Sequence, residues 1–473
     1  MKKIVGAAWL ALAALAAAAC AGDVHTDSAG TSGATSSTTS GTGGSCSVSL
    51  PVGCGCPDHA GPWAQRFGVA GDDAQTDFYP AGALPLAPDG SVVLSLRTLN
   101  AAGTEILSAR LVKLDAAGHT LWDQPWEQAV SIPLPAPDPR DCSTLVTGTI
   151  SAGATTLLGQ TLTCGTAYCP FVARIDAAGA LGWVKVYDFG GDAWTTPSIA
   201  GVLPDGRIAL VGPFQGTIDL GNGPLSVPDY PSSGVFVALL SPAGDALWSR
   251  HFTKEGKALG SYFAVSAVVS PAGDITVATS PDGAVDFGEG ALPAPGASVN
   301  GGLALASYDP TGALRFGRVI VSPDTDTDMP SLVRDSAGHL IIAETVGGMA
   351  DFGGGPVGAP GPWHTAVAAF DADGQYLWST ALEATFSGGL AVDAADHLRV
   401  GTAAGELAEL DPGGALVAMH PIGGSGARAA WAVGFAPGGA PVIAGTFEAT
   451  LDLGTGALTA KSKHDTFVAA LAP

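Results

Sequence analysis

From residue 60 onward, apolar and polar residues alternate with a period of two in short segments. This alternation predicts half-buried β-strands, and the Gly and Asp residues between the segments supply the positive φ that tight hairpins need. One hairpin type ends in a tryptophan. Its copies are Ala109–Asp123, Phe171–Lys185, Phe236–Arg250 and Ala366–Thr380, with weaker copies at Leu303–Gly317 and Leu407–Met419.

A second hairpin type, with a turn of Pro, Asp and Gly, alternates with the first along the chain. Its copies are Leu84–Leu96, Gly201–Gly212, Ala267–Thr279, Leu332–Glu344, Leu390–Gly401 and Val433–Gly445, with a degenerate copy at Ser143–Gly159. Two such hairpins provide four strands, which is one blade of a β-propeller. The abundance of glycine (67) and proline (34) agrees with many short strands and tight turns.

The repeat length indicates that one blade is shorter than the others. The turn glycines of the tryptophan hairpins fall at 118, 179, 244, 312, 374 and 413, so that the last interval is the short one. A third marker, an aspartate between apolar residues followed by glycines, occurs at Asp219, Asp286, Asp351 and Asp452 and skips the same blade. We interpret this marker as a turn capped by the aspartate, since no motif of a kinase accompanies its Asp-Phe-Gly form.

The two ends of the repeat region complement each other. Residues His464–Pro473 form the first strand of a tryptophan hairpin without its second strand, and Gly61–Gly68 has the pattern of that missing strand. A propeller that shares one blade between its termini leaves no unpaired edge at the closure. The sequence therefore predicts an all-β fold, a β-propeller of about seven blades closed by N- and C-terminal strands.

The Asp/Gly turn followed by tryptophan resembles the repeats of pyrroloquinoline-quinone-type propellers and of outer-membrane assembly lipoproteins built on them. The third marker is similar to repeats of a broad class of bacterial propeller proteins. The resemblance covers residues 61–473 and implies that a tryptophan docks between blades at Trp63, Trp122, Trp183, Trp248 and Trp378. Phe316 and Val417 depart from this pattern, and we expect weaker packing there.

The N-terminus predicts export and a lipid anchor. Two lysines and an apolar run precede Cys20, which gives residues 1–19 the form of a signal peptide. The run resembles the lipobox of bacterial lipoproteins, which implies acylation of Cys20, although Ala17 stands where that family prefers leucine. The alternative is ordinary cleavage and a soluble exported protein. Residues 20–45, rich in Gly, Ser and Thr, then form a flexible tether, 46–60 a cysteine-rich connector and 61–473 the propeller.

Six further cysteines are disulfide candidates: Cys46, Cys54, Cys56, Cys142, Cys164 and Cys169. Disulfides are favoured over metal binding because the chain is predicted to be exported and no second cysteine pair has zinc-site spacing. We expect the last three cysteines to lie close together in one blade and the first three to tie the tether to the body.

The formal net charge of −23 argues against nucleic acid as a partner and leaves the lipid anchor as the only membrane contact. Asp324, Asp326 and Asp328 are spaced as in calcium loops but lack the turn glycine and the distal acid. We interpret them as an acidic loop, with a Ca²⁺ site as the weaker alternative and no other cofactor expected. The loops between blades and the inserts should share one acidic, glycine-rich face.

No nucleophile, base or metal-ligand motif stands out, and no catalytic residue is predicted. The leading hypothesis is a non-enzymatic binding or scaffold module at the cell envelope, on the outer membrane or cell surface, which recognises protein or carbohydrate through its loop-rich face. The alternative is a periplasmic enzyme, either quinoprotein-like or a lyase. It would require Arg66, Arg207, Arg334 and Arg428 to converge on the central funnel.

Overall fold

A computed structural model describes Cys54 and most of residues 61–472. The positions outside this description are 1–53, 55–60, 69–73, 80–81, 101–105, 127–133, 188–193, 228–232, 255–264, 281–283, 293–301, 322–325, 463 and 473. The described residues form strands joined by turns, and no helix among them is long and apolar enough to cross a membrane.

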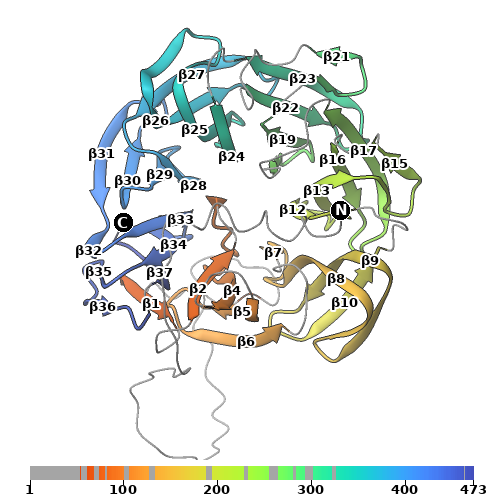
Figure 1. Ribbon diagram of the computed structural model, residues 1–473, viewed down its shortest axis with the longest axis horizontal. Helices are drawn as coiled ribbons and strands as arrows, with labels where there is room; N and C mark the ends of the chain where they lie inside the picture. Colours follow the sequence, from red (N-terminus) through yellow and green to blue (C-terminus); the bar gives the residue numbers. More distant parts are fainter. Residues whose placement is uncertain are drawn as a thin grey trace, which may run out of the picture.

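Among the described residues, seven larger sheets of mainly antiparallel strands stand around a central axis like the blades of a propeller (Figure 1). Each sheet is given from its inner to its outer strand. The first contains β2 (Ala74–Tyr79), β4 (Val92–Asn100), β5 (Ile106–Leu114) and β6 (Thr120–Trp126), and the second β7 (Leu134–Pro137), β8 (Thr144–Leu157), β9 (Gln160–Ile175) and β10 (Leu181–Val186). The third contains β11 (Trp194–Thr195) with β12 (Ser198–Val202), β13 (Ile208–Gln215), β16 (Ser233–Leu240) and β17 (Ala246–Lys254).

The remaining four sheets follow in chain order around the ring. They contain β18 (Val265–Val269), β19 (Ile275–Thr279), β22 (Gly302–Tyr308) and β23 (Leu314–Val321); β24 (Asp326–Arg334), β25 (Leu340–Asp351), β26 (Pro356–Phe370) and β27 (Tyr376–Leu382); β28 (Phe386–Val392), β29 (Leu398–Thr402), β30 (Glu406–Leu410) and β31 (Leu416–Pro421); and β33 (Arg428–Phe435), β34 (Pro441–Phe447), β37 (Asp465–Ala470) and β1 (Trp63–Phe67). A short strand, β3 (Gly82–Ala83), runs parallel to β33.

The last of these sheets closes the ring as the sequence predicted. β1 pairs antiparallel with β37, in a register that runs from Trp63 opposite Ala470 to Phe67 opposite Thr466. The all-β propeller shared between the two ends of the repeat region is thus confirmed. The core lies between neighbouring sheets: Val211 and Val237 of the third sheet, for example, are buried against Val277 of the fourth.

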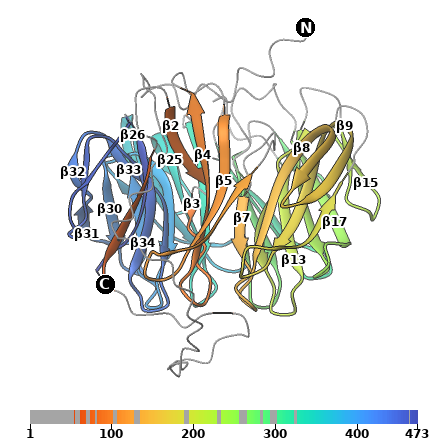
Figure 2. The same cartoon turned by 90° about the horizontal axis from the view of Figure 1, so that it is seen from below.

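The strand order divides the ring into two faces, which Figure 2 shows from the side. We call the turn face the one that carries the tight turns between first and second and between third and fourth strands, such as those at Gly90 and Gly118. The opposite, insert face carries the connections between second and third strands and those between successive sheets. The long β8–β9 hairpin extends beyond the ring on the insert face (Figure 2).

The inserts take two forms. In the third, fourth and seventh blades they are additional hairpins: β14 (Thr217–Asp219) with β15 (Pro224–Ser226), β20 (Val285–Asp286) with β21 (Ala291–Leu292), and β35 (Thr450–Asp452) with β36 (Leu458–Thr459). The strand β20 also pairs with β17 of the third sheet, and β35 pairs with β32 (Gly423–Ser425). In the second and fifth sheets the extra residues lengthen β8–β9 and β25–β26 themselves. The sixth sheet has no insert, because Thr402 ends β29 and Glu406 already begins β30.

Neighbouring blades are joined by an aromatic ring that rests on a glycine. Trp248 at the start of β17 packs on Gly312 in the β22–β23 turn of the next blade, and its indole nitrogen donates a 3.0 Å hydrogen bond to the Pro310 carbonyl oxygen. The equivalent contacts are Trp63 on Gly118, Trp122 on Gly179, Trp183 on Gly244 and Trp378 on Gly414. The structure thus agrees with the role that the resemblance implied for these tryptophans.

Two details of the sequence-based expectations need correction. The sixth turn has its positive φ (84°) at Gly414, one residue beyond the glycine chosen from the spacing. Phe316 packs on Gly374 as the tryptophans do on their glycines, so the weaker packing expected there is not observed. Because the turn glycine is Gly414, the strand register places Ala418, not Val417, where the other blades have the aromatic ring. Val417 is 58% exposed, as is its counterpart Leu247 in β17 at 51%. The next blade has no turn to receive a ring from position 418, because β37 and β1 close it.

We predict that Trp248→Ala lowers the free energy of unfolding by about 3–5 kcal/mol, because it removes a buried ring and its hydrogen bond at a blade joint. Gly312→Ala should also destabilise, since φ is +82° and the added Cβ would lie 2.8 Å from the Trp248 ring. Val417→Ala, at an exposed position of the outer strand β31, is the control and should change stability by less than about 0.5 kcal/mol. Urea denaturation followed by tryptophan fluorescence measures all three. Equal losses for Trp248→Ala and Val417→Ala would contradict the joint.

Candidate functional site

The inner strands enclose a central channel of about 810 Å³. Its lining is mostly apolar, with residues such as Pro135, Ile199, Val269, Leu332 and Val433 contributed by five different sheets. This volume is within the range of small-ligand sites. Arg334 is the one charged side chain among the described residues that line the channel.

The arginines that an enzyme in the funnel would require are not brought together. Arg66 forms an ion pair with Asp465 at 2.8 Å in the closing sheet, and Arg207 pairs with Asp205 at 2.7 Å in the turn before β13. Arg428 donates a 2.9 Å hydrogen bond to the Gly426 carbonyl oxygen at the start of β33. Of the four, only Arg334 reaches the described channel lining.

Arg334 is held in place by neighbours at the turn face. It donates hydrogen bonds to the Gly338 carbonyl oxygen at 2.9 Å and to the Thr276 hydroxyl at 3.3 Å. Burial lowers the pKa of its guanidinium, and the charge of Arg315 acts in the same direction, whereas Asp274 opposes the shift. Arg315 itself pairs with Asp274 at 2.6 Å. The arrangement positions one cation in an apolar channel, and no Asp, Glu, His or Lys accompanies it among the described lining residues.

The insert hairpins are held by their aspartates, as the sequence predicted. Ile218 and Leu220 are buried while Asp219 between them is exposed. The Asp219 carboxylate accepts hydrogen bonds from the backbone N–H groups of Gly221 (2.7 Å) and Gly223 (3.1 Å). Asp286 and Asp351 make the same pair of bonds, and Asp452 makes the first of the two. These aspartates cap turns through backbone hydrogen bonds, and we assign them no catalytic or metal-binding role.

The insert face also exposes large apolar side chains at strand ends. Ile106 and Leu107 begin β5, Tyr168 lies on the extended β9, Met349 on the extended β25 and Trp363 on β26. Exposed aromatic and aliphatic residues of this size are typical of interaction surfaces, where they can provide anchors for a partner. The loops predicted recognition on this face, but the sequence pattern gave no sign of these residues, because their exposure depends on how far β9 and β25–β26 extend.

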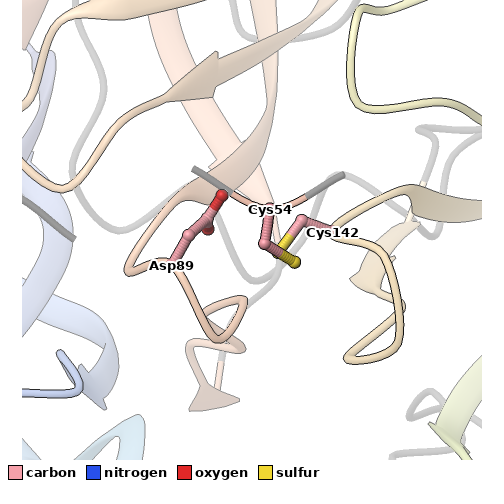
Figure 3. A group of neighbouring side chains, drawn as sticks. All are labelled: Cys54, Asp89 and Cys142. Carbon is pink, nitrogen blue, oxygen red and sulfur yellow. A yellow bond between two sulfur atoms is a disulfide. The ribbon is translucent and has the colours of Figure 1, made fainter. Parts of the chain in front are cut away.

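A disulfide shows where the chain enters the ring. Cys54 is bonded to Cys142, 88 residues later, in the turn between β7 and β8 (Figure 3). Asp89 lies beside this disulfide, with the three ligand-type atoms within 4.8 Å of one another. Its carboxylate accepts hydrogen bonds from the Ser91 backbone N–H (2.9 Å) and hydroxyl (2.6 Å). Since both sulfurs are oxidised, this group lacks the thiolates that a metal site needs.

The second disulfide corrects the expected cysteine cluster. Cys164 and Cys169 are bonded to each other within the extended part of β9 on the insert face. Cys142 belongs to the same sheet but precedes β8 at the turn face, so the three cysteines do not lie close together as expected. Cys20, Cys46 and Cys56 lie outside the described residues.

A buried lysine near several aspartates lies at the turn face and was not predicted from the sequence. Lys113 of β5 is buried, and its ammonium donates a 2.6 Å hydrogen bond to the Cys142 carbonyl oxygen. Burial lowers the pKa of Lys113, while the charges of Asp89, Asp141 and Asp176 counter the shift. The only signal in the sequence is a lysine at a position of β5 flanked by Val112 and Leu114, both fully buried. The hydrogen bond from Lys113 supports the turn that carries the Cys54–Cys142 disulfide.

The acidic run considered as a calcium loop is described only in part. Asp324 lies outside the described residues. Asp326 and Asp328 lie in β24, where their backbones pair with Gly347 and Thr345 of β25, so this part of the run is a strand rather than a loop. The calcium alternative remains a prediction.

Solved structures similar to this chain are known. No family model and no curated protein matches the chain. Among solved structures, the chain is similar to the hydrazine synthase of Kuenenia stuttgartiensis (14% identity, 78% of this chain and 93% of that one, TM-score 0.43), to BamB from Moraxella catarrhalis (14%, 83% and 85%, 0.38) and to a quinohemoprotein alcohol dehydrogenase from Pseudomonas putida (11%, 86% and 76%, 0.40).

We predict that the double substitution Cys54→Ala, Cys142→Ala lowers the free energy of unfolding by about 4–5 kcal/mol, because this disulfide closes a long loop. The double substitution Cys164→Ala, Cys169→Ala removes a disulfide that closes a much shorter loop, and it should lower the free energy of unfolding by about 2 kcal/mol. Urea denaturation of the two variants beside the unsubstituted chain measures the difference. A larger loss for the second pair would show that the first does not brace the ring.

Proposed function

We propose that this chain is a non-enzymatic binding or scaffold module of the bacterial cell envelope, anchored by lipid on Cys20 and binding a partner through its insert face. The partner class is protein or carbohydrate. The observation that carries the proposal is the opposition of the two faces. The chain enters the ring on the turn face, and the exposed side chains of Tyr168 and Trp363 lie on the insert face.

The entry point rests on two contacts. Cys54 is bonded to the β7–β8 turn, and Trp63 at the start of β1 packs on Gly118 in the β5–β6 turn. Both turns belong to the turn face. A tether that arrives there leaves the insert face directed away from the anchoring membrane, where a partner can reach it.

The channel offers weaker support for the enzymatic alternative. A periplasmic enzyme would use convergent polar groups to orient and activate a substrate. The described lining provides one charged side chain, Arg334. Two of its guanidinium nitrogens bond to the Gly338 carbonyl and Thr276, its Nε has no hydrogen-bond partner, and no acid or base accompanies it in the described lining. We therefore favour recognition on the insert face.

The structure changes how this proposal should be tested. Removing an insert hairpin would expose the core, because Ile218, Leu220 and Leu225 of the β14–β15 hairpin are buried with Phe214. Changes restricted to exposed side chains leave that core intact.

We predict that a photo-crosslinking amino acid at Trp363 or Tyr168 forms a discrete adduct with one envelope partner in cells of the native host. The same amino acid at Leu247, an exposed residue of the outer strand β17, is the control and should give no such adduct. Adducts are detected on denaturing gels and identified by mass spectrometry. Equal labelling from Leu247 would contradict the assignment of the insert face.

We also predict that Cys20→Ser transfers the chain from the membrane fraction to the soluble exported fraction, because the acyl chains would be lost. Intact-mass analysis of the unsubstituted protein from host membranes should show cleavage before Cys20 and added acyl groups. An unlipidated mass, with the chain soluble in both forms, would refute the anchor while leaving the binding face open to the crosslinking test.

A further inference from the structure

Arg334 lies at the turn-face end of the central channel, because it is the last residue of the inner strand β24. Most of the other lining residues are Ala, Val, Leu, Ile, Pro or Gly. A cation in apolar surroundings loses part of its hydration, and an anion that pairs with it compensates for this loss. The described lining contains no such anion.

Two carboxylates act on Arg334 from outside the lining, and each has a partner of its own. Asp274 pairs with Arg315 at 2.6 Å, and Asp335 contacts the Nδ1 of His339 at 2.7 Å. Arg334 itself forms no ion pair with any described residue. Its guanidinium nevertheless stays charged at neutral pH, as arginine does in proteins.

The guanidinium also has more hydrogen-bond donors than acceptors around it. An arginine side chain has five N–H groups. One from Nη1 bonds to the Gly338 carbonyl oxygen and one from Nη2 to the Thr276 hydroxyl, while the Nε–H has no acceptor among the described residues. Donors of Arg334 therefore remain for a ligand in the channel.

We propose that the channel is a binding site for an aliphatic monocarboxylate, whose carboxylate accepts hydrogen bonds from Arg334 and whose alkyl chain extends toward the insert face. The planar guanidinium matches the two oxygens of a carboxylate in geometry and charge. The lining favours a ligand with a single charge, because a second carboxylate farther along the channel would lie among apolar groups without a partner.

The inner strands specify the apolar part of this ligand. All five residues of β18, Val265–Val269, line the channel, which is a length of about 13 Å at the usual rise of a strand. The extended chain of octanoate is shorter than this. Phe435 is the one aromatic residue in the described lining, so the channel favours an alkyl chain over a flat ring system.

The formal net charge of −23 acts against an anion mainly at long range. At an ionic strength of about 0.15 M the Debye length is about 8 Å, so distant surface charges are largely screened. The partly buried contact with Arg334 is screened much less. The channel is separate from the exposed side chains of the insert face, and the inference does not rest on the proposed function.

Isothermal titration calorimetry tests the proposal with the purified full chain carrying Cys20→Ser, which has no cysteine to acylate at that position. We expect octanoate to bind one-to-one and at least about tenfold more tightly than octan-1-ol, because hydrogen bonds between charged groups are stronger than neutral ones. Octanedioate should bind more weakly than octanoate, since its second carboxylate would enter the apolar part of the channel.

Arg334→Gln should lower the affinity for octanoate at least about tenfold and leave the affinity for octan-1-ol unchanged. Arg207→Gln is the matched control, since Arg207 also lies at the turn face but pairs with Asp205 and does not line the described channel. It should bind octanoate as the unsubstituted chain does. Circular dichroism shows whether both variants are folded.

Three results would each overturn the proposal: no saturable binding of octanoate, equal affinities for octanoate and octan-1-ol, or an Arg334→Gln variant that keeps its affinity for octanoate. The first two need no substitution in the channel, so they decide the question even if Arg334→Gln does not fold. None of these measurements involves the insert face, so failure here leaves the proposed function to its own crosslinking test.

Discussion

The structure depends on one contact repeated around the ring, an aromatic side chain resting on a glycine of the next blade. The glycine is required twice: its φ is positive, and a Cβ would collide with the ring, as for Gly312 below Trp248. The contact is local in space but links strands about 60 residues apart. Each blade is thus held by its successor, and a sheet that could not bury both of its faces alone becomes stable within the ring.

Closing such a ring with the two ends of the repeat region has a structural consequence. The blade that contains β37 and β1 has no turn between its third and fourth strands, and the preceding blade has nothing to rest on. The sequence reflects this, since alanine stands at position 418, where the other blades have the aromatic residue, while Phe316, which does face a turn glycine, remains aromatic. The substitution that resembled an irregular repeat is explained by the position of the closure.

The fold could be predicted because the same pattern of strand and turn residues recurs in successive blades. Alternation, turn residues and the complementary ends all describe local geometry, and they predicted the strands, the capped insert turns and the β1–β37 pairing. The pairing of Cys54 with Cys142 could not be predicted in this way, since it depends on how the chain crosses the turn face. The exposure of Tyr168 and Trp363 was equally hidden, because it follows from strand lengths beyond the repeat.

Fold and recognition are separated within the inserts themselves. The base of each described hairpin belongs to the core: Ile218 and Leu220 are buried, and the Asp219 carboxylate is occupied by two backbone N–H groups. Changing these residues would cost stability without altering the surface seen by a partner. The extended ends of β8–β9 and β25–β26 combine both: Leu162 and Phe352 are buried in the core, while Tyr168 and Trp363 are exposed. Cys164–Cys169 braces one of these extensions, which keeps Tyr168 near a fixed position while leaving its side chain exposed. A partner would therefore meet a preorganised surface, and specificity could vary there without disturbing the ring of aromatic–glycine contacts.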